Sequence, residues 1–194
     1  RILARTIKRN FNIAFYNEVT HHYWEGKQGA DVFALAFGLV PESDRKKVFA
    51  ALLEHLEKIN YHFDTGILAT PLLLKVLTEN GRADLAYRVM NQRDFPSYGY
   101  LADKKNNTLW ETWNGDGNDE GCGYCHPMFG SVVAWFYNSL AGIKPDLSNP
   151  GMKHFYVEPV IITSLKYCKA TYDSLYGKIR SSWKIDENGN LNLQ

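Results

Sequence analysis

The chain has 194 residues, of which 45% are hydrophobic and 14% aromatic, enough apolar surface to bury one sizeable core and part of a second. Its 22 Lys and Arg residues nearly balance 21 Asp and Glu residues, so the net charge of +1 creates no field that would attract nucleic acid or anionic lipid. No stretch approaches the roughly 20 apolar residues that a membrane span needs. We therefore expect a soluble globular protein with neither nucleic acid nor membrane as a partner.

Most of the chain carries apolar residues at helical spacing, with charged residues on the opposite side. The spacing predicts about six helices, joined in hairpins by short turns, at residues 2–16, 29–40, 43–59, 70–80, 82–93 and 127–141. Ser43 and Thr70 are the expected N-caps of two of these helices. His55 falls on the polar side of the 43–59 helix, which predicts a solvated side chain.

After Pro145 the apolar period changes to two, which is typical of half-buried strands. The alternation is clearest at residues 178–185, and Asn188-Gly189 then predicts a type I′ turn into a strand at 191–193. Residues 154–162 and 165–172 are further strand candidates. Helices followed by strands predict a mainly α protein with two domains, a helical one at 1–148 and an antiparallel β region at 149–194.

A stretch of about 30 residues, 95–125, lacks a helical stripe, and loops of this length in compact domains are usually functional. It contains Glu111 between Trp110 and Trp113. In an extended strand Glu111 would project opposite Trp110 and share a face with Trp113. A carboxylate beside large rings loses solvation, which is how a catalytic acid or base is tuned. The alternative is a structural Glu paired with a neighbouring Lys or Arg between two core tryptophans.

The five residues from Cys122 to His126 match the Cys-x-x-Cys-His pattern of c-type haem attachment, with Cys122 and Cys125 as the covalent attachment points and His126 as axial ligand. An electron-transfer cytochrome is therefore the alternative function from a different class. The match opens no haem-sized module and runs directly into the helix predicted at Pro127. The acidic turn at 116–121 lacks the ligand positions of an EF-hand, and no second Cys or His pair completes a zinc site. We expect no metal and no cofactor.

Several longer blocks occur in order along the chain: HFDTGILATP at 62–71, ENG at 79–81, FPSYGY at 95–100, TLWETW at 108–113, FGSV at 129–132, PGMKHF at 150–155 and YGKIRSSW at 176–183. Together they resemble glycoside hydrolase family 78, the α-L-rhamnosidases. The resemblance runs through nearly the whole chain from about Gly29. It implies a toroid of six helical hairpins followed by a β-sandwich, and inverting hydrolysis of terminal α-L-rhamnose.

The resemblance also assigns roles to four residues. Glu111 matches the general base, His126 matches a histidine that contacts the sugar, and Trp110 and Trp113 would line the sugar pocket.

The chain departs from the family pattern beside these residues. Thr112 stands where an Arg usually follows the base, which leaves the orientation of Glu111 open. Cys125 and Pro127 replace the usual Asn and Tyr around the histidine, which leaves the identity of the sugar open.

The acidic cluster that carries the family's general acid lies upstream of every block present here, and six helices in hairpins make only half of a closed ring. We therefore expect the C-terminal half of the catalytic toroid plus the start of the C-terminal β domain, with the missing N-terminal half as a partner and a rhamnoside as substrate. The isolated chain is expected to be inactive, because a base without its acid leaves the leaving group unprotonated. A non-catalytic carbohydrate-binding remnant is the third possibility.

Overall fold

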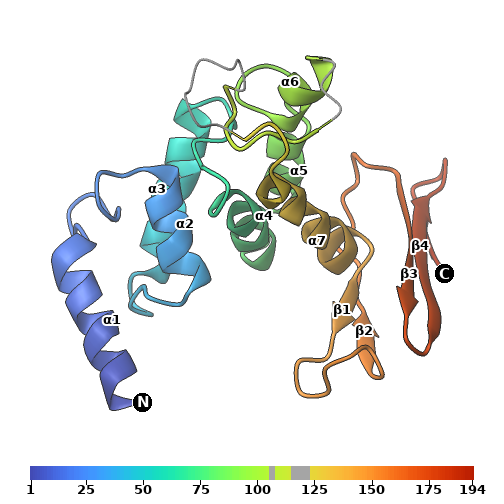
Figure 1. The fold of residues 1–194 in the computed structure, drawn as a ribbon, viewed down its shortest axis with the longest axis horizontal. Helices are drawn as coiled ribbons and strands as arrows, with labels where there is room; N and C mark the ends of the chain where they lie inside the picture. The colour runs from blue at the N-terminus through green and yellow to red at the C-terminus, as the bar shows by residue number, and fades with distance from the viewer. Residues whose placement is uncertain (105–107, 115–122) are drawn as a thin grey trace. The chain divides into compact units, whose positions relative to one another are not determined.

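The computed structural model describes residues 1–104, 108–114 and 123–194 (Figure 1). The chain divides into two compact units, Arg1–Gly130 and Ser131–Gln194, and each is described by itself. Within the described ranges, no helix has the length and apolar character required to cross a membrane.

Helical hairpins build the first unit, as predicted. Its described helices are α1 (Ile2–Phe15), α2 (Gln28–Ala36), α3 (Arg45–Lys58), α4 (Thr70–Glu79), α5 (Ala83–Met90) and α6 (Tyr98–Asp103). Helix α2 packs against α3 and α4, and α4 packs against α5. The predicted apolar stripes form this core, in which Val32, Leu52, Leu56, Leu74 and Leu77 have essentially no exposed surface.

Both predicted N-caps are wrong, because each hydroxyl has another partner. Helix α3 begins one residue later than expected, with Asp44 at its N-cap, and the hydroxyl of Ser43 donates to the Asp44 carboxylate at 3.0 Å. Thr70 lies inside α4, whose N-cap is Ala69, and its hydroxyl donates to the carbonyl oxygen of Gly66 at 2.9 Å.

The prediction that His55 is solvated is also wrong. Only 20% of its side chain is exposed, and its Nε2 lies 3.3 Å from Oδ2 of Asp64. Asp64, in the segment that follows α3, lies against His55, so this one side chain is largely covered although Glu54, Glu57 and Lys58 on the same side remain exposed.

Two further differences concern the segments around residues 95–141. Helix α6 forms inside the predicted loop, where Ser97 Oγ accepts a hydrogen bond from the backbone N–H of Tyr100 at 3.0 Å and so caps the helix. The helix expected at 127–141 is instead a 3₁₀ helix η1 (Pro127–Val132), a single α turn α7 (Val133–Trp135) and a π-helical turn η2 (Phe136–Leu140).

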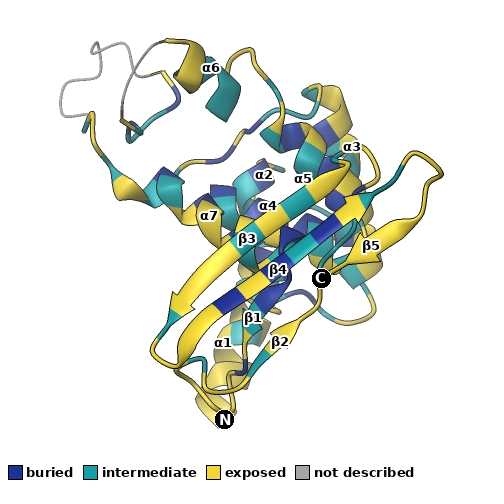
Figure 2. Cartoon of the chain, turned by 90° about the vertical axis from the view of Figure 1, so that its right-hand side faces the viewer, coloured by how far each residue is buried: buried dark blue, intermediate teal, exposed yellow. Residues whose placement is uncertain are grey.

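Two small antiparallel sheets form the second unit. One pairs β1 (Ile143–Pro145) with β2 (Phe155–Val157), and the other has the order β3 (Tyr167–Ser174), β4 (Gly177–Ile185) and β5 (Leu191–Leu193). The predicted alternation in β4 is confirmed, with buried and exposed residues following one another along the strand (Figure 2). Ile179, Ser181 and Trp183 point inward, where Ser181 Oγ donates to the carbonyl of Ala141 at 2.6 Å and Trp183 Nε1 donates to that of Leu140 at 2.7 Å.

The turn between β4 and β5 is not type I′. That turn needs positive φ at both central residues, but only Gly189 has it, at 83°. Gly189 N donates to Asp186 O at 3.0 Å and Asp186 N donates to Asn190 O at 2.9 Å, which closes a three-residue loop. The carboxylate of Asp186 accepts the backbone N–H groups of Asn188 and Asn190 and thereby selects this turn.

Neighbouring serines on β4 test the inward face. We expect Ser181→Ala to lower the free energy of unfolding by about 1–3 kcal/mol, because the buried carbonyl of Ala141 loses its donor. Ser182→Ala removes the same hydroxyl from the opposite face and should change stability by no more than about 0.5 kcal/mol. Urea denaturation of both variants measures the difference, and equal losses would contradict this account.

Candidate active site

An aromatic cluster holds the segment that carries Glu111. The ring of Trp113 is 9% exposed. Its centroid lies 5.0 Å from that of Phe63, 4.1 Å from that of Phe129 and 5.2 Å from that of Tyr98, the last in an edge-on arrangement. Trp113 Nε1 donates to the carbonyl oxygen of Thr65 at 2.7 Å. Trp113 therefore fixes residues 108–114 to the segment that leads into α4.

The hydroxyl of Tyr98 links the aromatic cluster to the backbone of η1. It donates to the carbonyl oxygen of Phe129 at 2.8 Å, and burial raises the pKa of the Tyr98 hydroxyl well above its ordinary value. The group therefore stays protonated and remains a donor across the working pH range of proteins. The bond holds η1, which follows His126, against α6.

Two segments on either side of residues 115–122 are joined by backbone hydrogen bonds. The N–H of Glu111 donates to the carbonyl of Gly123 at 2.9 Å, and the N–H of His126 donates to the carbonyl of Leu109 at 2.8 Å. Residues 108–114 are a bend rather than the extended strand considered from the sequence. The pairing brings Glu111 and His126 to neighbouring positions although 15 residues separate them in the sequence.

Gly123 lies between the two polar side chains. A Cβ built on it would be 3.2 Å from Oε2 of Glu111 and 4.0 Å from Cδ2 of His126. Its N–H donates to Oε2 of Glu111 at 2.9 Å. Within the described ranges, no Lys or Arg forms an ion pair with this carboxylate. A backbone N–H therefore orients the half-buried carboxylate of Glu111.

The imidazole of His126 has a defined donor side. Its Nδ1 accepts the backbone N–H of Met128 at 3.4 Å. In the neutral ring the proton then resides on Nε2. This arrangement makes Nε2 a hydrogen-bond donor.

The remaining predicted site residues differ in their surroundings. Trp110 is 8% exposed and meets the ring of Tyr124 edge-on at 5.9 Å. Contact of Trp110 or Trp113 with a sugar stays a prediction. Cys125 is exposed, whereas Cys122 and the acidic turn at 116–121 lie outside the described residues. Among the residues that the structure does describe, no cluster of three or more metal-binding side chains occurs.

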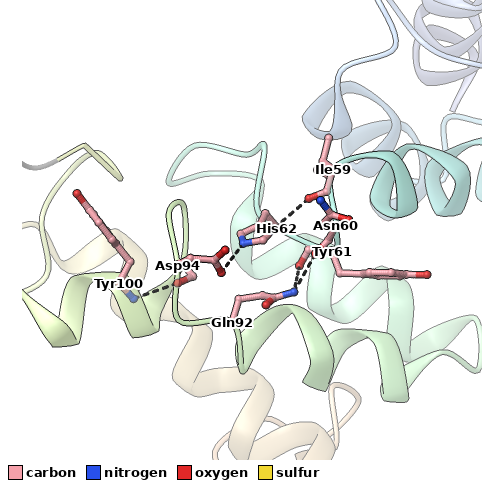
Figure 3. Close-up of polar contacts among 8 residues, drawn as sticks. Ile59, Asn60, Tyr61, His62, Gln92, Asp94 and Tyr100 are labelled. Carbon is pink, nitrogen blue, oxygen red and sulfur yellow. Dashed lines mark hydrogen bonds and ion pairs between the residues drawn. The ribbon is translucent and has the colours of Figure 1, made fainter.

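Sequence reasoning missed a hydrogen-bond network around residues 59–64, just before Thr65, and Figure 3 shows its part around His62. Gln28, which has no exposed surface, accepts the N–H of Asp64 at 3.1 Å and donates to the carbonyl of His62 at 3.3 Å. His62 Nδ1 lies 3.0 Å from the carbonyl oxygen of Ile59, and its Nε2 lies 2.8 Å from Oδ1 of Asp94. A glutamine at the first position of an apolar helix was the available signal.

The same network holds an unusual turn after α3. Asn60 and Tyr61 have φ values of 52° and 60°, a left-handed conformation that costs about 1–2 kcal/mol for each residue other than glycine. Gln92 Nε2 donates to the carbonyl of Asn60 at 2.8 Å (Figure 3). The guanidinium of Arg88 lies 3.6 Å from the centroid of the Tyr61 ring. These contacts from α5 and the segment after it keep the turn in place.

The indole N–H of Trp113 can be removed with the ring stack largely retained. We expect Trp113→Phe to lower the free energy of unfolding of the first unit by about 2–3 kcal/mol, because the buried Thr65 carbonyl loses its donor and some apolar contact is lost. Trp24→Phe is the matched control, since Trp24 is 63% exposed, and should change stability by about 0.5 kcal/mol or less. Chemical denaturation measures both, and similar losses would refute the role of this bond.

The His62 to Asp94 contact predicts a pH effect. The hydrogen bond from His62 lowers the pKa of the Asp94 carboxyl below its ordinary value. The contact therefore stabilises the fold above the ordinary carboxyl pKa of about 4 and loses its effect as pH falls through the lowered pKa. We expect His62→Gln to raise the pKa of Asp94, and ¹³C NMR of the carboxyl carbon measures this change. Asp84, whose pKa is lowered by Arg82, is the control, and its pKa should not change in this variant. An unchanged pKa of Asp94 would disprove its coupling to His62.

Two family models match the chain. Residues 1–140 match the family model of the bacterial alpha-L-rhamnosidase 6 hairpin glycosidase domain, and residues 142–194 match the bacterial alpha-L-rhamnosidase C-terminal domain. Among curated relatives, the alpha-L-rhamnosidase of Streptomyces avermitilis is 36% identical over 84% of this chain and 16% of its own length. One from Formosa agariphila is 35% identical over 96% of this chain and 20% of its own length.

Solved structures show the same fold. The crystal structure of the Streptomyces avermitilis alpha-L-rhamnosidase complexed with L-rhamnose matches with a TM-score of 0.89 at 34% identity, over 98% of this chain and 19% of that one. The alpha-L-rhamnosidase of Dictyoglumus thermophilum matches with a TM-score of 0.85 at 36% identity, over 95% and 21%. The chain thus spans about a fifth of the length of these relatives. It belongs to the bacterial α-L-rhamnosidase family of six-hairpin glycosidases.

Proposed function

We propose that this chain supplies the general base and part of the sugar site of an α-L-rhamnosidase that hydrolyses terminal α-L-rhamnosyl residues with inversion. The observation that carries the proposal is the placement of Glu111 and His126 on either side of Gly123, inside a domain of the rhamnosidase family. A similar protein of known structure is complexed with L-rhamnose, which supports rhamnose as the sugar.

In the proposed reaction, Glu111 takes a proton from water while the water oxygen bonds to the anomeric carbon. The glycosidic bond breaks on the opposite face, and a carboxylic acid gives its proton to the leaving oxygen. Inverting enzymes keep these two carboxyl groups about 6.5–9.5 Å apart, which leaves room for the water. The Gly123 N–H fixes one oxygen of Glu111, and His126 Nε2 donates to a sugar hydroxyl. Trp110 and Trp113 are proposed to border the sugar.

The general acid is proposed to come from a part of the enzyme outside these 194 residues. On this view residues 1–148 are part of the catalytic toroid and residues 149–194 begin the C-terminal β domain. The partners are then a rhamnoside and the N-terminal half of the same enzyme. No metal and no cofactor takes part in the proposed chemistry.

The test compares hydrolysis of 4-nitrophenyl α-L-rhamnoside by the 194-residue chain with hydrolysis by the same chain fused behind the corresponding upstream segment of the Streptomyces avermitilis relative. We expect the chain alone to be inactive and the fusion to release β-L-rhamnose first, as seen by ¹H NMR. In the fusion, Glu111→Gln should lower kcat by about 10²–10⁴-fold, the usual contribution of a general base. Glu57→Gln on the exposed side of α3 is the matched control.

Each result has a separate meaning. Hydrolysis by the chain alone would refute the need for an upstream acid. An active Glu111→Gln fusion would refute the base assignment. Rhamnose binding without turnover, even in the fusion, would favour the carbohydrate-binding remnant, and a Soret band in the visible spectrum would favour the cytochrome.

A further inference from the structure

One face of the β3–β4–β5 sheet is exposed and positively charged. The register pairs Cys168 with Trp183 and Ala170 with Ser181, and these residues face the buried cluster around Ile143 and Ile179. The alternate residues therefore lie on the opposite face, where the exposed positions of both long strands are visible (Figure 2). We call this the outer face, and it is defined by Tyr167, Lys169, Arg180, Ser182, Lys184 and Asn192.

Three cations on the outer face have no counter-ion in the described parts of the chain. They are Lys169, Arg180 and Lys184, and none of them forms an ion pair there. The acid on the same side of β3, Asp173, is already paired with Lys178 at 2.7 Å. The outer face therefore carries a surplus of positive charge that the near-neutral chain as a whole does not have.

Asp186 at the end of β4 does not neutralise this charge. Hydrogen bonds from Asn190, together with the smaller effect of the Lys184 charge, lower the pKa of Asp186. Its carboxylate accepts the N–H groups of Asn188 and Asn190 at 3.0 and 2.8 Å. Asp186 is therefore committed to the turn.

The strand register concentrates the three cations. Lys169 lies directly opposite Ser182, so Lys169 is diagonal to both Arg180 and Lys184. Diagonal neighbours in a sheet are about 7–8 Å apart, within the Debye length of about 8 Å at physiological salt. The three positive charges therefore repel one another in the free protein, and an anion bound between them would reduce this repulsion.

The outer face is also hollowed. A hollow of about 290 Å³ is lined by Tyr167, Lys169, Ser182, Lys184 and Asn192, among others. Tyr167 is 66% exposed and pairs directly with Lys184 across the strands. Such a ring offers a flat apolar surface for a sugar, while hydroxyl and amide groups supply donors and acceptors. Lysine adds a charge-assisted bond to a carboxylate or sulfate.

From this arrangement we infer that the outer face binds an anionic sugar unit of a polysaccharide, at a site separate from Glu111. The charge of the ligand follows from the sheet alone, whereas its being a saccharide rests on the proposed glycosidase function. A single aromatic ring is a poor platform for nucleic acid, which stacks successive bases. Tyr167 alone is too little apolar surface for membrane insertion, which needs a continuous apolar face.

Affinity electrophoresis of the 194-residue chain tests the site. We expect polygalacturonate, a uronate polymer, or dextran sulfate, a sulfate ester, to retard the chain, and neutral dextran not to do so. The double variant Lys169→Gln with Lys184→Gln should weaken binding about tenfold or more. The matched control, Lys46→Gln with Lys153→Gln, removes the same charge from exposed positions elsewhere and should weaken binding less than about twofold at 0.15 M salt.

Further variants separate the ligand classes. Tyr167→Ala should weaken polysaccharide binding about fivefold and leave binding to duplex DNA unchanged. Glu111→Gln should leave polysaccharide binding unchanged, so failure of this site and failure of the proposed reaction are distinguishable. Circular dichroism checks that the exposed substitutions leave the fold intact. Absence of retardation by both anionic polymers, equal loss in the two double variants, or stronger binding to DNA than to either polymer would overturn the inference.

Discussion

The hydrogen bond from Trp113 Nε1 to the carbonyl of Thr65 is the constraint on which the candidate site depends. The segments around Glu111 and His126 are hydrogen-bonded to each other, so they form a self-contained pair. The position of these two segments relative to the helices is fixed by the buried indole of Trp113, which forms one hydrogen bond and three ring contacts. Each ring contact adds about 0.5–1.5 kcal/mol beyond its buried area.

Thr65 is a reliable acceptor because its own segment is fixed independently. The buried side-chain amide of Gln28 forms hydrogen bonds with the backbone of the two residues that flank Phe63. The hydroxyl of Thr65 lies 2.8 Å from that of Thr70 in the first turn of α4. The left-handed turn at residues 60–61 directs the chain back from α3 toward this point. The helix packing, the turn and the indole thus form one connected series of contacts that leads to the segment carrying Glu111.

The parts of this arrangement that follow a repeating pattern were predictable. The apolar stripes of α2 to α5 and the alternation of β4 can be seen in the sequence because burial imposes a period on the chain. The choice of a side chain's partner imposes no period on the sequence. The predictions of a cap at Ser43, of a solvated His55 and of a type I′ turn at Asn188 were wrong for this reason. For the same reason the sequence placed Glu111 near two indoles but could not show that Trp113 lies in the aromatic cluster and contacts Thr65.

The departure at Thr112 has a structural counterpart. In the family pattern that the sequence resembles, an Arg follows the proposed base and offers a guanidinium charge to the carboxylate. Here the N–H of Gly123 orients Glu111, and among the standard residues only proline at this position would remove that donor. An N–H group also carries no net charge, so it fixes the geometry of the carboxylate without forming an ion pair. A Cβ at position 123 would lie 3.2 Å from Oε2 of Glu111, so any larger residue there would make the Glu111 carboxylate shift by a few tenths of an ångström, and glycine leaves the space between Glu111 and His126 open.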